Sequence, residues 1–179
     1  VLETKTSSFD ETWEMPWGEQ KTVRNNYNQL VLSLIEKEEP FRVMNVVFRA
    51  FNDGIGFKYE FPETDGIKEL KILDEKSEFN LTGDPTCWWI PADWDCYEHR
   101  YNTSKLSEIN AIAKRENLHL SRTTIMENAV NTPVTMKTED GIYLSFHEAA
   151  LFDYSGMTLK VDTLNLSLTS SLVGSENHK

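Results

Sequence analysis

Glu148, in the segment YLSFHEAALFDY, is the first candidate functional residue, because it is a carboxylate among apolar strand residues. Side chains alternate between the two faces of a β-strand, so in an extended segment Glu148 falls in the same row as Leu144 and Phe146. An unpaired carboxylate in such an apolar row costs several kcal/mol, so it must be neutralised, paired with a basic residue or bound to a cation. The alternative is that the strand ends near His147 and that Glu148 is simply exposed.

His147 is a candidate metal ligand or proton shuttle, because the charge of an imidazole changes near neutral pH. Neighbouring residues of a strand point to opposite faces, however, so His147 and Glu148 cannot easily serve one site. The simpler interpretation is a histidine on the polar face of the strand.

The segment between residues 88 and 101 is the second candidate, because it is rich in aromatic and acidic residues. Flat rings stack against the apolar faces of sugars, and carboxylates accept hydrogen bonds from sugar hydroxyls. The alternative is that the rings pack in a core or an interface. The aromatic residues are Trp88, Trp89, Trp94, Tyr97 and Tyr101, and they are interleaved with Asp93, Asp95, Glu98 and His99.

A third cluster contains Trp13, Trp17, Glu19 and Arg24. Arg24 can hold a carboxylate through two parallel hydrogen bonds, and a structural Arg–Glu pair is the simpler role. No Ser–His–Asp order, phosphate loop or dinucleotide fingerprint is present. The candidate substrate or interface residues are therefore Trp88, Trp89, Trp94, Glu98, Arg24 and His147.

Cys87 and Cys96 are the two cysteines of the chain, and they bracket the segment WWIPADWD. A disulfide that closes so short a loop would stabilise the fold by about 2.5–3 kcal/mol in the chain-entropy model. The alternative is two free, partly buried thiols. Without a CxxC motif or a Cys/His cluster, a structural zinc site is not expected.

β-Strands predicted from the sequence are expected to position these candidate residues. Residues 55–61 alternate between apolar and polar side chains, which is typical of a half-buried strand. Residues 41–51 are almost continuously apolar, which predicts a strand covered on both faces. Asn52-Asp53-Gly54 between them predicts a hairpin turn, in which a glycine tolerates a positive φ. Further strands are predicted at 28–36, 69–73, 77–81, 133–138, 142–147, 157–161 and 164–172, with turns at 62–66 and 139–141.

The fold class predicted from these strands is all-β, an antiparallel β-sandwich in a single domain over residues 1–179. One segment is predicted to be either helical or irregular. Leu106, Ile109 and Ala113 recur there at helical spacing, with Ser104 as a possible cap, and residues 117–131 have no clear pattern. The chain begins with polar residues and an aromatic patch without an earlier strand, so we expect the sandwich to be incomplete at its N-terminus.

The net charge of −11 disfavours nucleic acids and anionic membrane surfaces as partners, because an acidic surface repels phosphate groups. No stretch approaches the roughly 20 apolar residues of a membrane span. We therefore expect neither a nucleic-acid partner nor a membrane span.

Four segments carry a resemblance to a known family: FDETWEMPWGEQKTVRNNYNQL, RAFNDGIGFKYEFP, TGDPTCWWIPADWDCYEHRYNTSKLSEI and TPVTMKTEDGIYLSFHEAALFDYSGMTL. In this order they resemble signatures of the N-terminal domain of glycoside hydrolase family 97. The resemblance implies an N-terminal β-sandwich, a catalytic (β/α)8 barrel and a small C-terminal β domain. The family's strands before the first motif and its link into the barrel are not matched here. The resemblance therefore implies that the barrel lies outside this chain, and that this chain has no catalytic residue.

The resemblance also implies a function. Members of the family cleave terminal α-glucosidic or α-galactosidic bonds, with inversion or retention, and they depend on calcium. A glutamate of the N-terminal domain binds that calcium, and Glu148 matches its position. The chain is thus expected to be the non-catalytic part of a periplasmic or secreted bacterial α-glycosidase, with an oligosaccharide substrate and its own barrel as partners.

Two other functions remain open. The chain can be a free-standing sugar-binding module that uses the segment from Trp88 to Tyr101. It can also be a scaffold whose aromatic patches dock a neighbouring domain, and its isolated form should then self-associate.

Overall fold

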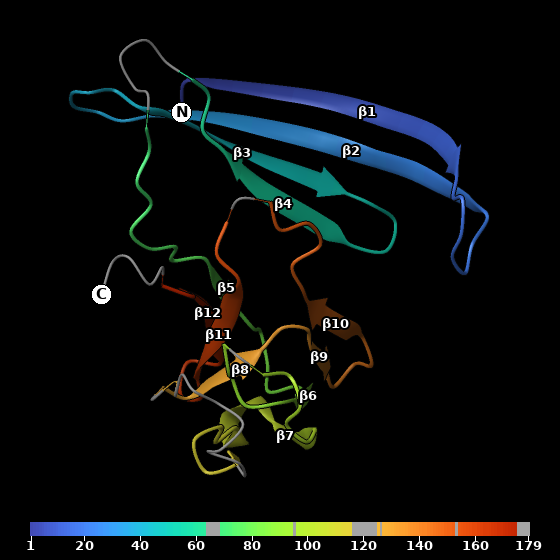
Figure 1. Cartoon of the computed structure of the whole chain (residues 1–179), viewed down its shortest axis with the longest axis vertical. Coiled ribbons are helices and arrows are strands. Elements are labelled where there is room, and N and C mark those ends of the chain that lie inside the picture. The colour runs from blue at the N-terminus through green and yellow to red at the C-terminus, as the bar shows by residue number, and fades with distance from the viewer. Residues whose placement is uncertain (64–68, 95, 116–124, 126, 153, 175–179) are drawn as a thin grey trace. The chain divides into compact units, whose positions relative to one another are not determined.

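The computed structural model describes residues 1–63, 69–94, 96–115, 125, 127–152 and 154–174 (Figure 1). The chain is all-β and divides into two compact units, Val1–Lys71 and Ile72–Lys179. All of its strand pairings are antiparallel. The first unit contains β1 (Glu3–Glu14), β2 (Thr22–Ile35), β3 (Val43–Ala50) and β4 (Ile55–Glu60).

The first unit is a four-stranded sheet in which each strand pairs with the next along the chain, in the order β1-β2-β3-β4. The predicted strand at residues 28–36 is confirmed as part of β2, and its Leu30, Leu32 and Leu34 lie opposite Phe48, Val46 and Met44 of β3. The cross-strand pairs of one face place these apolar side chains side by side, and such pairs stabilise a sheet.

Strand β1 was missed in the sequence. Its segment ETKTSSFDETWE is polar and exposed along its whole length, so it has no alternation of buried and exposed residues. It is a strand because its backbone pairs with β2 along the full register from Glu3↔Ser33 to Glu14↔Thr22. Backbone pairing of this kind leaves no hydrophobic pattern in the sequence.

Strand β3 corrects a second prediction. Residues 41–51 were expected to be covered on both faces, but within β3 only Val47 is buried, and the other apolar residues are at most half-buried. The hairpin to β4 is confirmed by the hydrogen bond from the Phe51 N–H to the Gly54 carbonyl. Gly54 does not have a positive φ, whereas Gly18 and Gly141 do. Hairpin geometry here does not require the left-handed region at residue 54.

The second unit contains two four-stranded sheets, in the orders β10-β9-β6-β7 and β5-β12-β11-β8. Their buried side chains form one core, with Trp89 and Met136 from the first sheet and Leu159 and Leu168 from the second. The predicted β-sandwich is therefore confirmed. The strands are β5 (Glu78–Asn80), β6 (Thr86–Trp89), β7 (Asn102–Lys105), β8 (Ala129–Asn131), β9 (Val134–Lys137), β10 (Tyr143–Phe146), β11 (Met157–Asp162) and β12 (Ser167–Leu172).

Two strand predictions are wrong in whole or in part, and the segment after residue 104 follows the irregular alternative. Residues 69–73 form no strand. The helical spacing after residue 104 yields only the short 3-10 helix η1 (Leu106–Glu108), which Lys105 caps while Ser104 belongs to β7. The strand predicted at 164–172 begins only at Ser167, because the Asp162 side chain accepts the backbone N–H groups of residues 164 and 165 and so stabilises a turn there. Leu164 is 92% exposed in this turn.

Other turns and strands agree with the sequence pattern. The hairpin at residues 139–141 is present, with Gly141 at a φ of +90° between β9 and β10. Part of the predicted turn at 62–66 and most of the segment 117–131 lie outside the described residues. Among the described residues, no helix has the length and apolar character that a membrane crossing needs.

Candidate functional site

Glu148 lies two residues beyond the end of β10, at the start of the loop that leads to β11. The strand ends at Phe146, but the alternation of burial continues, so His147 is exposed and Glu148 is half-buried. Its Oε2 accepts a hydrogen bond from the backbone N–H of Met157 at 3.2 Å. The sequence left two alternatives for Glu148, a core-facing position in the strand or an exposed position after it. Each holds in part, because the strand ends before Glu148 and the carboxylate is nevertheless partly withdrawn from water.

The loop after Glu148 exposes apolar side chains. Leu151 is 48% and Phe152 is 84% exposed, and Ala149 and Ala150 are exposed as well. The other end of this loop is anchored, because the Tyr154 hydroxyl donates to Oε2 of Glu75 at 2.9 Å. An anchored loop that presents large apolar groups beside a carboxylate is typical of an interaction surface.

Glu148 has no group of metal ligands around it within the described residues. Nowhere in that part of the chain do three His, Cys, Asp or Glu side chains gather closely enough to hold a metal ion. His147 is exposed, whereas Glu148 is half-buried. Within the described residues, Glu148 is therefore not part of a cluster of acidic, histidine or cysteine ligands.

The aromatic segment is divided between the core and the surface. Trp89 is 1% exposed, and its Nε1–H donates to Ser104 Oγ at 3.1 Å. Trp94 is half-buried and packs against Ala92, Ile125 and Ala129. These two rings support the packing alternative. Trp88 is half-buried on the other side of β6, while Tyr97 and Tyr101 are 59% and 65% exposed.

The polar residues of this segment include a buried hydrogen-bonded pair that the sequence did not reveal. His99 Nε2 lies 2.9 Å from Asp93 Oδ2, and the two side chains are only 5% and 3% exposed. The Asp93 N–H donates to Asn131 Oδ1, and Asn131 Nδ2 donates to the Cys96 carbonyl. These bonds fix the loop between β6 and β7 to β8. Glu98, by contrast, is exposed, and its N–H donates to Cys96 Sγ.

We expect His99→Ala to destabilise the second unit by about 1–3 kcal/mol, because it removes one partner of a buried carboxylate. Urea unfolding followed by tryptophan fluorescence measures this loss. The matched control is His147→Ala, at an exposed histidine of the same unit, which should change the free energy of unfolding by less than about 0.5 kcal/mol. Equal effects of the two substitutions would contradict a structural role for the Asp93–His99 pair.

Arg24 forms a two-point ion pair, but with Asp10 of β1 and not with a glutamate. Its Nε and Nη2 donate to Asp10 Oδ1 and Oδ2 at 2.8 and 2.6 Å. The hydrogen bond from Arg24 lowers the pKa of the Asp10 carboxyl. Both side chains are exposed on the β1–β2 ribbon, where such pairs contribute little to stability. The structural interpretation of Arg24 is thus supported.

Cys87 and Cys96 are both buried and free, which agrees with the alternative of two free thiols and not with a disulfide. Burial raises the pKa of the Cys87 thiol to about 12, with a smaller contribution from Asp84. The thiolate is the reactive form, so Cys87 is inert at neutral pH.

We expect iodoacetamide to leave Cys87 unmodified in the native chain at pH 8 and to modify it fully in urea, as peptide mass spectrometry can show.

The stability of the fold should also depend on pH through Cys87. Because its folded pKa is raised, Cys87 keeps its proton while the unfolded thiol ionises above about pH 9. Its burial therefore lowers stability as pH rises from about 9 toward 12. Cys87→Val should lose less stability between pH 8 and 10.5 than the parent chain, and an equal loss would contradict this origin.

The family model of the glycosyl-hydrolase 97 N-terminal domain matches residues 1–178. The chain belongs to this family. The resemblance found in the four sequence segments is thereby confirmed, and the GH97 N-terminal domain accounts for both the β-sandwich and the order of the motifs.

Individual relatives agree with the GH97 assignment. A glycoside hydrolase family 97 enzyme from Pseudoalteromonas sp. strain K8, solved in complex with acarbose, is 32% identical with a TM-score of 0.79, and the match covers 96% of this chain and 23% of that one. A retaining alpha-galactosidase from Bacteroides thetaiotaomicron is 27% identical over 167 residues, which are 87% of this chain and 22% of that protein. A beta-arabinopyranosidase, 14% identical with a TM-score of 0.70, shares the fold alone. The chain thus spans less than a quarter of the length of its GH97 relatives.

Proposed function

We propose that this GH97 N-terminal domain is the non-catalytic part of a calcium-dependent α-glycosidase, and that Glu148 is its contribution to the calcium site. The parent protein would hydrolyse terminal α-linked glucose or galactose and would act in the periplasm or outside the cell. The chemistry would be performed by a catalytic barrel outside this chain. The printed names of the relatives support the substrate class, because they include a retaining alpha-galactosidase and family 97 enzymes solved with acarbose and with panose.

The observation that carries the proposal is the state of Glu148. Its carboxylate is half-buried, and one of its oxygens is held by the Met157 N–H. Among the described residues, no lysine or arginine lies within ion-pair distance of it. A carboxylate partly withdrawn from water gains stability from a cation, so this position suits a metal ligand.

The donor chemistry of Glu148 suits calcium, although one glutamate cannot hold it. Ca²⁺ takes about six to eight oxygen ligands, and carboxylates are among its preferred ones. Glu148 can supply one or two of these oxygens, and the others must come from the rest of the parent protein. When bound, calcium would supply positive charge that stabilises negative charge on nearby oxygens.

The exposed loop beside Glu148 supports a shared site. Leu151 and Phe152 would be covered if the parent protein packs a second surface against residues 149–152. The role of the GH97 N-terminal domain would then be to hold Glu148 at a fixed position, with the hydrogen bond to Met157 orienting the carboxylate. Rigid support of this kind is what metal ligands need.

Calcium removal from the full-length protein tests the proposal. We expect chelation to abolish the hydrolysis of an aryl α-glucoside or aryl α-galactoside, and we expect added calcium to restore it. The 179-residue chain alone should hydrolyse neither substrate and should bind calcium only weakly in calorimetry. Full activity after chelation, or sub-micromolar calcium binding by this chain alone, would contradict the proposal.

A further inference from the structure

The outer face of the β10-β9-β6-β7 sheet differs in chemistry from its inner face. Cys87, Trp89, Val134 and Met136 point into the core and are at most 1% exposed. The alternate residues point outward, so the same four strands present a second row to solvent. Its central members are Trp88, Thr135, Lys137, Tyr143 and Ser145.

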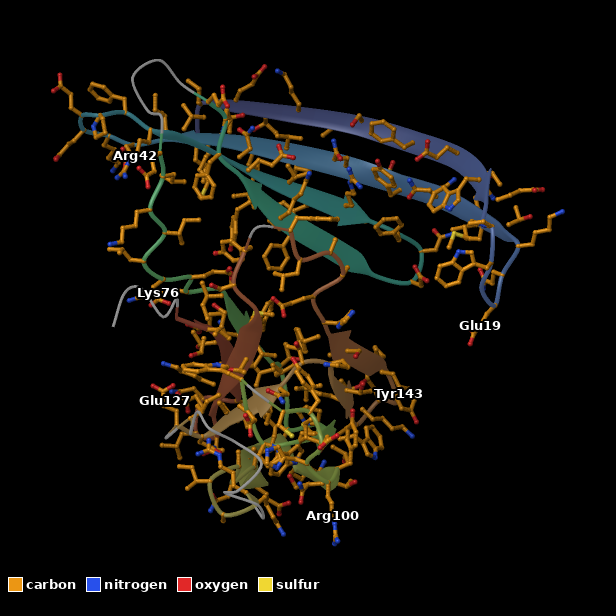
Figure 2. All side chains as sticks on the ribbon, viewed as in Figure 1. Glu19, Arg42, Lys76, Arg100, Glu127 and Tyr143 are labelled. Carbon is orange, nitrogen blue, oxygen red and sulfur yellow. The ribbon has the colours of Figure 1, made fainter. Side chains whose placement is uncertain are left out.

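Trp88 and Tyr143 form an aromatic pair on this face. Their ring centroids are 6.1 Å apart and their planes differ by 14°, so the rings are nearly parallel and offset. Trp88 comes from β6 and Tyr143 from β10, and their rings meet across β9, which lies between these strands. Tyr143 is 62% exposed, and Figure 2 shows it on the outer side of β10. Part of the aromatic surface of this pair is therefore exposed to solvent.

Hydroxyl and ammonium groups surround the pair. Thr135 Oγ1 and Ser145 Oγ are 3.1 Å apart, and the next outward residue of β9, Lys137, has its Nζ 5.3 Å from the centre of the Tyr143 ring. Strands β6, β7, β9 and β10 contain no Asp or Glu, although the chain has a net charge of −11. This face is thus less acidic than the chain as a whole, and it is rich in hydrogen-bonding groups.

These features fit a sugar better than a protein or a nucleic acid. A protein interface needs an apolar centre, and this row has no aliphatic residue among its outward side chains. Two lysines, one of which (Lys105) lies 4.0 Å from Glu139, are too few for a phosphate backbone. Flat rings bordered by hydroxyl and ammonium donors match a pyranose ring, which has an apolar face and hydroxyls at its rim.

We propose that the outer face of the β10-β9-β6-β7 sheet is a surface site for a neutral oligosaccharide, with a sugar ring stacked on the Trp88–Tyr143 pair. The inference rests on the proposed function, since it assumes a parent protein that acts on α-linked sugars. The site would hold a chain near the enzyme without taking part in bond cleavage. The sugar would then contact Trp88 and Tyr143. Trp88 is the one sequence candidate of the aromatic segment in this site, and Tyr143 was not among those candidates.

Affinity electrophoresis of the full-length protein tests the proposal. Native gels would contain amylopectin, galactomannan or polygalacturonate, and Glu148→Gln would be used as the background so that the gel polymer is not consumed. We expect at least one neutral polymer to retard the protein, and we expect Tyr143→Ala and Trp88→Ala to raise its dissociation constant about ten-fold. Tyr143→Phe keeps the ring and should keep the retardation.

The matched control is Trp17→Ala, which removes an 83% exposed tryptophan from the turn between β1 and β2 and should leave the retardation unchanged. Unchanged retardation in Tyr143→Ala and Trp88→Ala would overturn the proposal, and so would retardation by polygalacturonate alone or an equal loss in Tyr143→Phe. Retardation needs no turnover, so a lack of hydrolytic activity in Glu148→Gln does not prevent this result.

Discussion

Glu148→Gln in the full-length protein should reduce kcat for an aryl α-glycoside by roughly 100-fold or more at limiting calcium. Glutamine has nearly the shape of glutamate and can still accept the Met157 N–H, but it carries no charge for a divalent cation. Loss of a group that only orients a metal ligand already costs about 10–100-fold in affinity or activity, so loss of a ligand should cost at least as much. Steady-state kinetics over a calcium titration measures the effect.

The control for this prediction is Glu75→Gln, because Glu75 is a half-buried glutamate of the same unit and its Oε2 binds the Tyr154 hydroxyl of the same loop. It should leave the calcium dependence unchanged. High calcium should partly restore Glu148→Gln, since a weakened site can be filled by mass action. If Glu148→Gln keeps both its kcat and its calcium dependence, then Glu148 does not bind the metal ion.

Trp89→Ala should destabilise the second unit by about 3–5 kcal/mol, which is the range for removal of a large aromatic side chain from a packed core. Trp89 is 1% exposed, lies between the two sheets of the sandwich and uses its indole N–H on Ser104. Domain stabilities are about 5–15 kcal/mol, so the substitution removes a large fraction of the total. The urea midpoint, followed by near-ultraviolet circular dichroism, reports the loss.

Two tryptophan substitutions elsewhere serve as comparisons. Trp17→Ala removes an exposed ring and should change the free energy of unfolding by less than about 0.5 kcal/mol. Trp88→Ala, at the neighbouring but outward-facing position of β6, should cost less than Trp89→Ala. If Trp89→Ala instead keeps its stability and only weakens sugar binding, its core assignment is wrong and the sequence prediction of a substrate contact is right.

The difference between Trp88 and Trp89 shows what the sequence can and cannot predict at this site. Their position in an aromatic segment indicated packing or sugar binding, but composition does not say which neighbour faces the core. Strand β6 decides this, because alternate residues point to opposite faces and the second sheet covers only one of them. The buried Asp93–His99 pair was missed for a similar reason, since a contact between loop residues leaves no periodic pattern.

The sequence by itself determined the family, the all-β class and most of the strands, because strand periodicity and long family motifs are local properties of the chain. It also singled out Glu148, whose row of apolar neighbours is visible without coordinates. Only the tertiary structure decided that β1 is a strand, that β10 ends before Glu148 and that Trp88 meets Tyr143 across β9. These features depend on pairing between distant segments, and the energy of such pairing is shared between residues that are not adjacent in the sequence.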